Sequence, residues 1–167
     1  TFTNGNYDSQ SGDVSIVINK KAATVVADPQ TKVFGSANPT LTAVVGGTVG
    51  IETLNYSLST TADTNSAVGS YPITVSLGSN PNYDVTPTDN TLEVTPATAT
   101  CSIIGYTGDY DGAAHGASGS CTGVGGADLT SSVSLGSSFT DVPGGTAHWT
   151  FTNGNYDSQS GDVSIVI

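Results

Sequence analysis

The residues of this sequence that could do chemistry are two cysteines, two histidines and one close pair of carboxylates. Cys101 and Cys121 lie twenty residues apart. This spacing fits a disulfide between adjacent strands, which would stabilise the fold by about 3 kcal/mol on the chain-entropy model. The alternative is two free buried thiols. A zinc site needs two further ligands, and His115 and His148 do not stand at a zinc-binding spacing from the cysteines, so we expect no firm metal site.

The close carboxylates, Asp109 and Asp111, stand in the sequence GDYDG. Such a pair could act as acid and base in glycoside hydrolysis, but that reaction also needs a cleft, which this short chain does not build around them. An aspartate beside glycine is typical of a plain turn. No Gly-x-Ser-x-Gly elbow followed by a helix is present. We therefore expect a non-enzymatic protein without a cofactor, and calcium bound at this corner is the open alternative.

Charge restricts the partners of the chain. Three lysines oppose 14 acidic residues, which gives a formal net charge of −11. Nucleic acids and anionic membranes bind through basic residues, so neither is an expected partner. Membrane insertion is not expected either, because the sequence contains no apolar stretch of about twenty residues. Lys20 and Lys21 fall at a predicted domain junction. Lys32 could face inward and form an isopeptide bond, but we expect a solvated turn lysine.

Apolar and polar residues alternate in short runs that end at Gly, Pro, Asn or Asp. Ile73 and Val75, for example, alternate with Thr74 and Ser76. This period of two indicates half-buried antiparallel strands. Strands that recur about every ten residues between turn residues predict small β-sandwiches. The fold class we predict is all-β, with no α-helix.

The segment TFTNGNYDSQSGDVSIVI occurs twice, letter for letter, as Thr1–Ile18 and as Thr150–Ile167. An identity of this length indicates duplication, and the step from residue 1 to residue 150 gives a period of 149 residues. We therefore interpret residues 1–18 as the closing hairpin of a preceding copy. Four apolar residues of each segment should be buried alike when that copy is present: Phe2, Val14, Ile16 and Ile18 in the first, and Phe151, Val163, Ile165 and Ile167 in the second.

A weaker internal repeat divides the rest of the chain into two related units, residues 19–97 and 98–167. Both units close with a strand, an Asn-x-Asn-Tyr-Asp turn and another strand. In these turns, Asn80–Asp84 and Asn153–Asp157, we expect the tyrosine to bond back to the backbone at a strand corner. The alternative is that tyrosine and asparagine form an exposed surface for sugars.

Motifs in both units are similar to known bacterial surface repeats. Lys21–Ala97, with ADPQTKVFGSANPTL, VGSYPITV and NPNYDVT, resembles the MBG family. Thr98–Ile167, with CSIIGYTGDYDGAAHGASGSCTGVGG and WTFTNGNYDSQSG, resembles the YDG repeats, although the first unit has Val33-Phe34-Gly35 where the second has the full Tyr-Asp-Gly turn. The resemblance implies immunoglobulin-like sandwiches in large secreted proteins, without an established enzymatic activity or ligand residues to carry over.

Three functions are compatible with the sequence. We favour a structural link of an extended extracellular stalk or fibre that supports surface attachment, because the linkers VINKKAAT and VTPATAT contain no flexible spacer and the negative charge keeps neighbours apart. Its partners would be neighbouring copies of the same repeat. The second function is an adhesin module for glycan or a host protein, which would need Tyr7, Tyr106, Tyr110 and Tyr156 exposed together. The third is a non-covalent filament in which residues 1–18 are donated to a neighbour, although the identity of the two segments disfavours a dedicated donor.

Overall fold

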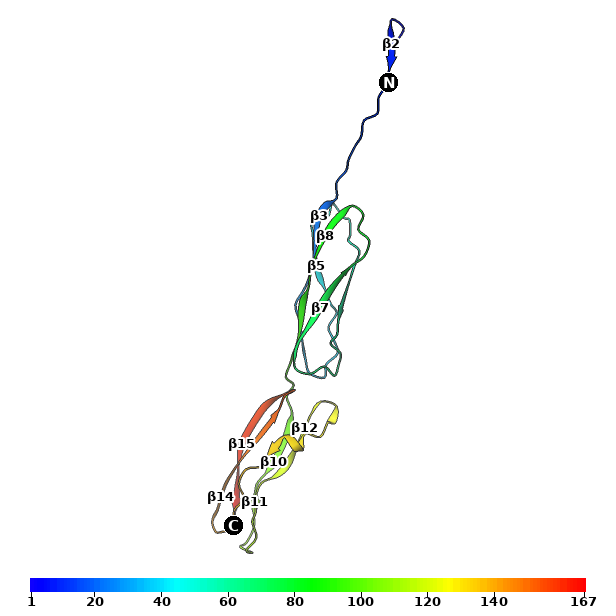
Figure 1. Cartoon of the computed structure of the whole chain (residues 1–167). Helices are drawn as coiled ribbons and strands as arrows, with labels where there is room; N and C mark the ends of the chain where they lie inside the picture. Colours follow the sequence, from blue (N-terminus) through cyan, green and yellow to red (C-terminus); the bar gives the residue numbers. More distant parts are fainter.

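The computed structural model describes all residues, 1–167, and they form an elongated molecule (Figure 1). A small hairpin lies at the N-terminal end, an extended segment follows it, and two groups of strands then lie one after the other. The strands confirm the predicted all-β class. The helical residues form only two short 3-10 turns, Val124–Gly126 and Thr130–Ser132, and no helix is long and apolar enough to cross a membrane.

The first sandwich consists of a three-stranded sheet, β5-β3-β8, and a four-stranded sheet, β4-β9-β7-β6. Its strands are β3 (Lys21–Ala27), β4 (Gln30–Val33), β5 (Ala43–Gly46), β6 (Tyr56–Thr60), β7 (Gly69–Leu77), β8 (Tyr83–Thr88) and β9 (Asn90–Thr95). The alternating positions predicted from the sequence face the space between the sheets, where Val25, Ile73, Leu92 and Val94 are fully buried or nearly so. Their burial is the main force that holds the two sheets together.

The second sandwich consists of the pair β10-β12 and the four-stranded sheet β11-β15-β14-β13. Its strands are β10 (Thr100–Ile104), β11 (Tyr106–Thr107), β12 (Ser118–Thr122), β13 (Val133–Ser134), β14 (Gly144–Asn153) and β15 (Tyr156–Val166). Its separate core contains Ala97, Ala99, Cys121, Leu129, Phe151 and Tyr156. With six buried residues against the ten of the first sandwich, this core is the thinner of the two.

The two sandwiches have a similar strand topology. Each contains a parallel pair in its larger sheet, β4 with β9 and β11 with β15. Each also begins with a parallel contact to the tyrosine of the Asn-x-Asn-Tyr-Asp turn: Lys21 lies opposite Tyr83, and Ala97 lies opposite Tyr156. Tyr83 and Tyr156 therefore occupy equivalent positions.

The hydroxyls of these two tyrosines bond to equivalent backbone groups. Tyr83 Oη accepts a hydrogen bond from the Val49 N–H at 2.9 Å, and Tyr156 Oη accepts one from the Val124 N–H at 3.0 Å. The predicted corner role of the tyrosine is therefore confirmed in both units. Tyr83 also donates to the Glu52 carboxylate, and this carboxylate raises the pKa of the Tyr83 hydroxyl above its ordinary value.

The N-terminal hairpin, β1 (Phe2–Asn4) and β2 (Tyr7–Gln10), reproduces the tip of the β14–β15 hairpin. In β1–β2, Phe2 lies opposite Gln10 and Asn4 opposite Tyr7, and the identical residues pair in the same way at the tip of β14–β15. Beyond Gln10, however, residues 11–18 form no strand, whereas β15 continues to Val166. The local sequence thus specifies the hairpin tip, but the long strand forms only where partner strands are present.

Burial differs accordingly between the two identical segments. The Phe151 side chain is 0% exposed and Phe2 is 55% exposed. Ile165 is also buried, and Val163 and Ile167 are half-buried. Their counterparts Val14, Ile16 and Ile18 are exposed. The predicted burial of the first segment requires a preceding copy and stays a prediction.

Candidate interaction site: the joint between the two sandwiches

The two cysteines form a disulfide bond. Cys101 of β10 and Cys121 of β12 lie directly opposite each other in the antiparallel pair, and their sulfur atoms are bonded. Cys121 is fully buried in the second core. The bridge therefore joins the two strands of the smaller sheet and contributes to a core that is otherwise thin.

The aspartates of the GDYDG segment lie at an exposed turn that follows β11. Asp111 Oδ1 accepts a hydrogen bond from the Ala113 N–H at 2.8 Å and lies 2.9 Å from His115 Nε2. These contacts lower the pKa of Asp111, the backbone N–H first and the His115 hydrogen bond second. Asp109 is exposed. These contacts fit the turn role, and calcium binding at Asp109 and Asp111 stays a hypothesis.

Lys32 is buried, which corrects the expectation of a solvated turn lysine. Its side chain is 6% exposed, and its Nζ donates to the backbone carbonyls of Ser36, at 3.1 Å, and Asp63. The ammonium group thus joins the end of β4 to a loop about thirty residues further along the chain. The sequence did not reveal this because the partners are carbonyls, which every residue carries.

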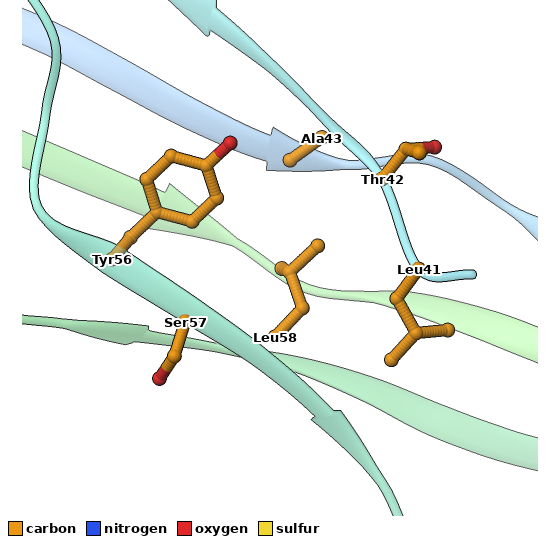
Figure 2. Close-up of a pocket in the computed structure, with 6 residues that line it drawn as sticks. All are labelled: Leu41, Thr42, Ala43, Tyr56, Ser57 and Leu58. Atoms are coloured by element: carbon orange, nitrogen blue, oxygen red, sulfur yellow. The ribbon is translucent and has the colours of Figure 1, made fainter.

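The main surface depression lies on the open side of the first sandwich, between the edge strands β5 and β6 (Figure 2). Tyr56 and Leu58 point from β6 toward Leu41 and Ala43. The other lining residues are Thr42 and Ser57, so no charged side chain lines it. The depression offers apolar contact and a few hydroxyl groups, and no set of groups for acid–base or nucleophilic chemistry.

The four tyrosines whose joint exposure would indicate an adhesin surface do not form one patch. Tyr7 is exposed on the N-terminal hairpin, and Tyr156 is buried in the second core. Tyr106 is half-buried and stacks on the His115 ring with centroids 3.8 Å apart. Tyr110 is exposed in the turn next to Asp111.

The most developed contact outside the two cores is the joint at which the sandwiches meet. The Phe34 ring meets the Tyr156 ring edge-on, with centroids 5.5 Å apart, and packs against both cores. Gly35 has a φ of 82°, and a Cβ at this position would lie 2.5 Å from the Val124 side chain. Glycine is therefore required here both by its backbone conformation and by the closeness of Val124.

Hydrogen bonds fix the orientation of this joint. The Val68 N–H, from the first sandwich, donates to Asn155 Oδ1 at 3.0 Å. The Ala97 N–H donates to the Asn155 carbonyl at 3.0 Å, and the Asp157 N–H donates to the Ala97 carbonyl at 2.8 Å. The linker therefore enters the second sandwich as a paired strand, and Pro96 immediately before Ala97 restricts it further. We call this contact the internal joint; its residues are Phe34, Gly35, Val68, Val124, Asn155 and Tyr156.

The internal joint explains what two sequence features do in addition to their predicted roles. The Asn-x-Asn-Tyr-Asp turn forms a corner as expected, but its Asn155 and Tyr156 also face the neighbouring sandwich. The sequence identified Phe34 only as an aromatic residue before a glycine and did not predict its contact with the second sandwich. The signal that could have identified the joint is the very short linker, which forces the ends of the two units into contact.

Comparison with known families agrees with part of the resemblance. Residues 23–93 match the family model of the MBG domain (YGX type), a range that covers most of the first sandwich. No curated protein matches the chain. The first sandwich, from β3 to most of β9, is thus similar to an MBG domain.

Proposed function

We propose that the chain is a non-enzymatic structural unit of an extended extracellular bacterial stalk or fibre with a tandem period of 149 residues. The two sandwiches are one MBG-like and one YDG-like domain, predicted at residues 19–97 and 98–167, except that Ala97 packs in the core of the second. The match to the MBG domain supports a surface repeat, because such domains are typical of surface proteins. The Cys101–Cys121 disulfide supports an oxidising compartment outside the cytoplasm.

One observation carries this proposal: the same eighteen residues stand in two different environments. As residues 150–167 they complete the second sandwich, with Phe151 and Ile165 in its interior. As residues 1–18 they form only the hairpin tip, and their apolar side chains are exposed. A segment that folds fully only as the end of a second sandwich belongs to a preceding copy of that sandwich.

The structure of the joint supports a mechanical role. Aromatic packing of Phe34 on Tyr156 is worth about 0.5–1.5 kcal/mol beyond the area it buries, and hydrogen bonds on two sides restrict rotation of one sandwich against the next. Stiff joints in series favour an extended fibre over a compact chain. The formal charge of −11 adds repulsion between neighbouring fibres.

Two alternatives differ from this proposal in what they require. An adhesin module needs a binding surface, and the scattered tyrosines do not supply one. A non-covalent filament needs residues 1–18 of one chain to displace residues 150–167, the end of β14 and all of β15, from the second sandwich of another. Because the two segments are identical and the displaced strand is held within its own chain, this exchange gains no contact energy.

The function can be tested on intact cells. Antibodies against the second sandwich should label unpermeabilised cells, and electron microscopy should show fibres. Strains in which whole 149-residue periods are deleted from the gene should carry fibres that are shorter in proportion to the number of periods removed. Fibre length that does not change with the number of periods would contradict a structural role, and labelling only after permeabilisation would contradict a surface location.

A further inference from the structure

Because the two sandwiches have a similar topology, each residue that the first sandwich contributes to the internal joint has a counterpart at the far end of the second sandwich. β4 and β11 each start opposite a fully buried aliphatic residue of the closing strand, Leu92 or Ile165. Phe34 and Tyr110 each lie four residues beyond that start. By this strand register Tyr110 is the counterpart of Phe34, which corrects by one residue the sequence alignment of Tyr110-Asp111-Gly112 with Val33-Phe34-Gly35.

The second contact of the joint is repeated in the same way. The antiparallel partners of those two buried residues are Tyr71 and Gly145. Val68 and Val142 each lie three residues before these partners. Val142 is thus the counterpart of Val68, the residue whose N–H bonds to Asn155.

The opposite end of the first sandwich carries the complementary half. Tyr83 corresponds to Tyr156, so Asn82, which precedes it, corresponds to Asn155. Val49 corresponds to Val124, because each donates its N–H to the corner tyrosine. Both valines are also followed by a glycine with positive φ, Gly50 at 59° and Gly125 at 65°.

These two ends lack the partners that their counterparts have in the internal joint. Tyr110 is 61% exposed and Val142 is 64% exposed, whereas Phe34 and Val68 are half-buried. At the other end, Val49 and Ile51 are exposed, whereas the Tyr83 ring beneath them is already buried in the first core. We call the first surface the tail end (Tyr110, Asp111, Gly112 and Val142) and the second the head end (Val49, Ile51, Asn82 and Tyr83).

The linker sets the same separation at both junctions. In the internal joint, three residues lead from buried Val94 to Ala97. In the duplicated segment, three residues lead from Ile18 to Lys21, whose N–H donates to the Asn82 carbonyl at 3.0 Å, as Ala97 does to the Asn155 carbonyl. A sandwich that ended at Ile18 would therefore stand as close to the head end as the first sandwich stands to the second.

The charges of the two ends also favour a preceding copy of the second sandwich as the partner of the head end. Two of the three lysines of the chain, Lys20 and Lys21, lie in this linker. The tail end carries the acidic residues Asp109 and Asp111, with Asp141 next to Val142, and all three are exposed. Bringing the tail end to the linker would place its three aspartates near Lys20 and Lys21, although the exposed Glu52 bonded to Tyr83 is an acidic group at the head end.

We propose that the tail end of one second sandwich docks onto the head end of the first sandwich that follows it, forming an external joint built like the internal one. The occupant of the head end is thus the preceding copy of residues 98–167, which rests on the proposed tandem array. Tyr110 packs on the exposed Val49 and Ile51 next to Tyr83, and the Val142 N–H donates to Asn82 Oδ1. Val49 packs on the turn at Gly112, whose φ of 79° is close to that of Gly35 but which lies one residue further along than the strand register of Gly35.

Amide hydrogen exchange in a longer chain tests this joint. The chain is residues 1–167 followed directly by a second copy of residues 19–167, with only the first copy isotopically labelled by segmental ligation so that its amides are resolved by NMR. The Val142 amide of the labelled copy should exchange at least about tenfold more slowly than in the 167-residue chain, since it gains a hydrogen-bond partner. The Val68 amide, bonded in both chains, is the internal standard.

A matched pair of variants identifies the partner. Asn82→Ala in the second copy, at an exposed position, should return the Val142 amide to its rate in the 167-residue chain. Asn155→Ala in the same copy should leave the Val142 amide protected. An equal Val142 rate in the long and short chains, or protection that persists in the Asn82→Ala variant, would overturn the external joint. Neither result concerns whether the natural protein is a tandem array, which the mass of the natural polypeptide decides separately.

Discussion

The duplicated segment allows one substitution to be made twice in the same local sequence. Phe151→Ala and Phe2→Ala remove the same side chain from the same eighteen-residue context. Phe151 is fully buried and packs near Tyr156 in the second core, with ring centroids 6.3 Å apart, whereas Phe2 is mostly exposed. Any difference between the two variants therefore reports tertiary burial, because local propensity is the same in both.

The expected difference is large compared with the stability of a small sandwich. Replacing a buried Phe by Ala typically costs about 3–5 kcal/mol, while a surface change of this kind stays within about 0.5 kcal/mol. A domain of about 70 residues has a total free energy of unfolding of about 4–10 kcal/mol. Phe151→Ala should thus remove a large part of the stability of the second sandwich, and Phe2→Ala should remove almost none.

Urea unfolding followed by tryptophan fluorescence is the suitable assay. Trp149 is the only tryptophan, and it packs against the second core, so its emission reports that sandwich. If Phe151→Ala fails to fold, the milder pair Ile165→Val and Ile16→Val repeats the comparison, with an expected loss of about 0.5–1.5 kcal/mol for the buried position only. Equal losses at the two members of either pair would refute the assignment of different environments to the identical segments.

Replacing Cys101 and Cys121 together by Ala should lower the free energy of unfolding of the second sandwich by about 3 kcal/mol, measured by the same urea assay, and a loss below about 1 kcal/mol would show that the bridge does little. The lowered pKa of Asp111 means that its contribution to stability is complete above its ordinary pKa of 3.8 and is lost as the pH falls through the lowered folded-state value. The urea midpoint of the natural chain should therefore exceed that of Asp111→Asn at about pH 5 and approach it as the pH falls below about 4. A difference that grows over this fall in pH would contradict the bonds to His115 and the backbone. Lys32→Met should destabilise the first sandwich by about 1–3 kcal/mol, because the backbone carbonyls of Ser36 and Asp63 lose their charged donor. An unchanged unfolding transition of the first sandwich in calorimetry would disprove that role.

Local patterns were enough to predict the strands and the corners. The alternation around Ile73 and Val75 describes a strand that is buried on one side, and the structure has β7 there with both side chains in the core. The tyrosines of the two turns were expected to bond to the backbone, and both do. These features depend on residues close in sequence or on a single periodicity, which is why the sequence displays them.

Features that depend on distant partners were not visible in the sequence. Lys32 bonds to carbonyl groups, one of them on Asp63, and nothing in the side chains near Lys32 indicates this. The internal joint brings Phe34 to Tyr156 and Val68 to Asn155, pairs separated by many strands. Such contacts depend on the relative orientation of two folded units, so they can be predicted only when the topology of both units is known.

If residues 1–18 are the end of a preceding copy, both copies belong to one continuous polypeptide. The most direct test is the mass of the natural polypeptide, measured under denaturing and reducing conditions. We expect a mass many times the 16.7 kDa of the 167 residues described. A mass near 16.7 kDa would contradict it and would make the duplicated hairpin a device for joining separate subunits.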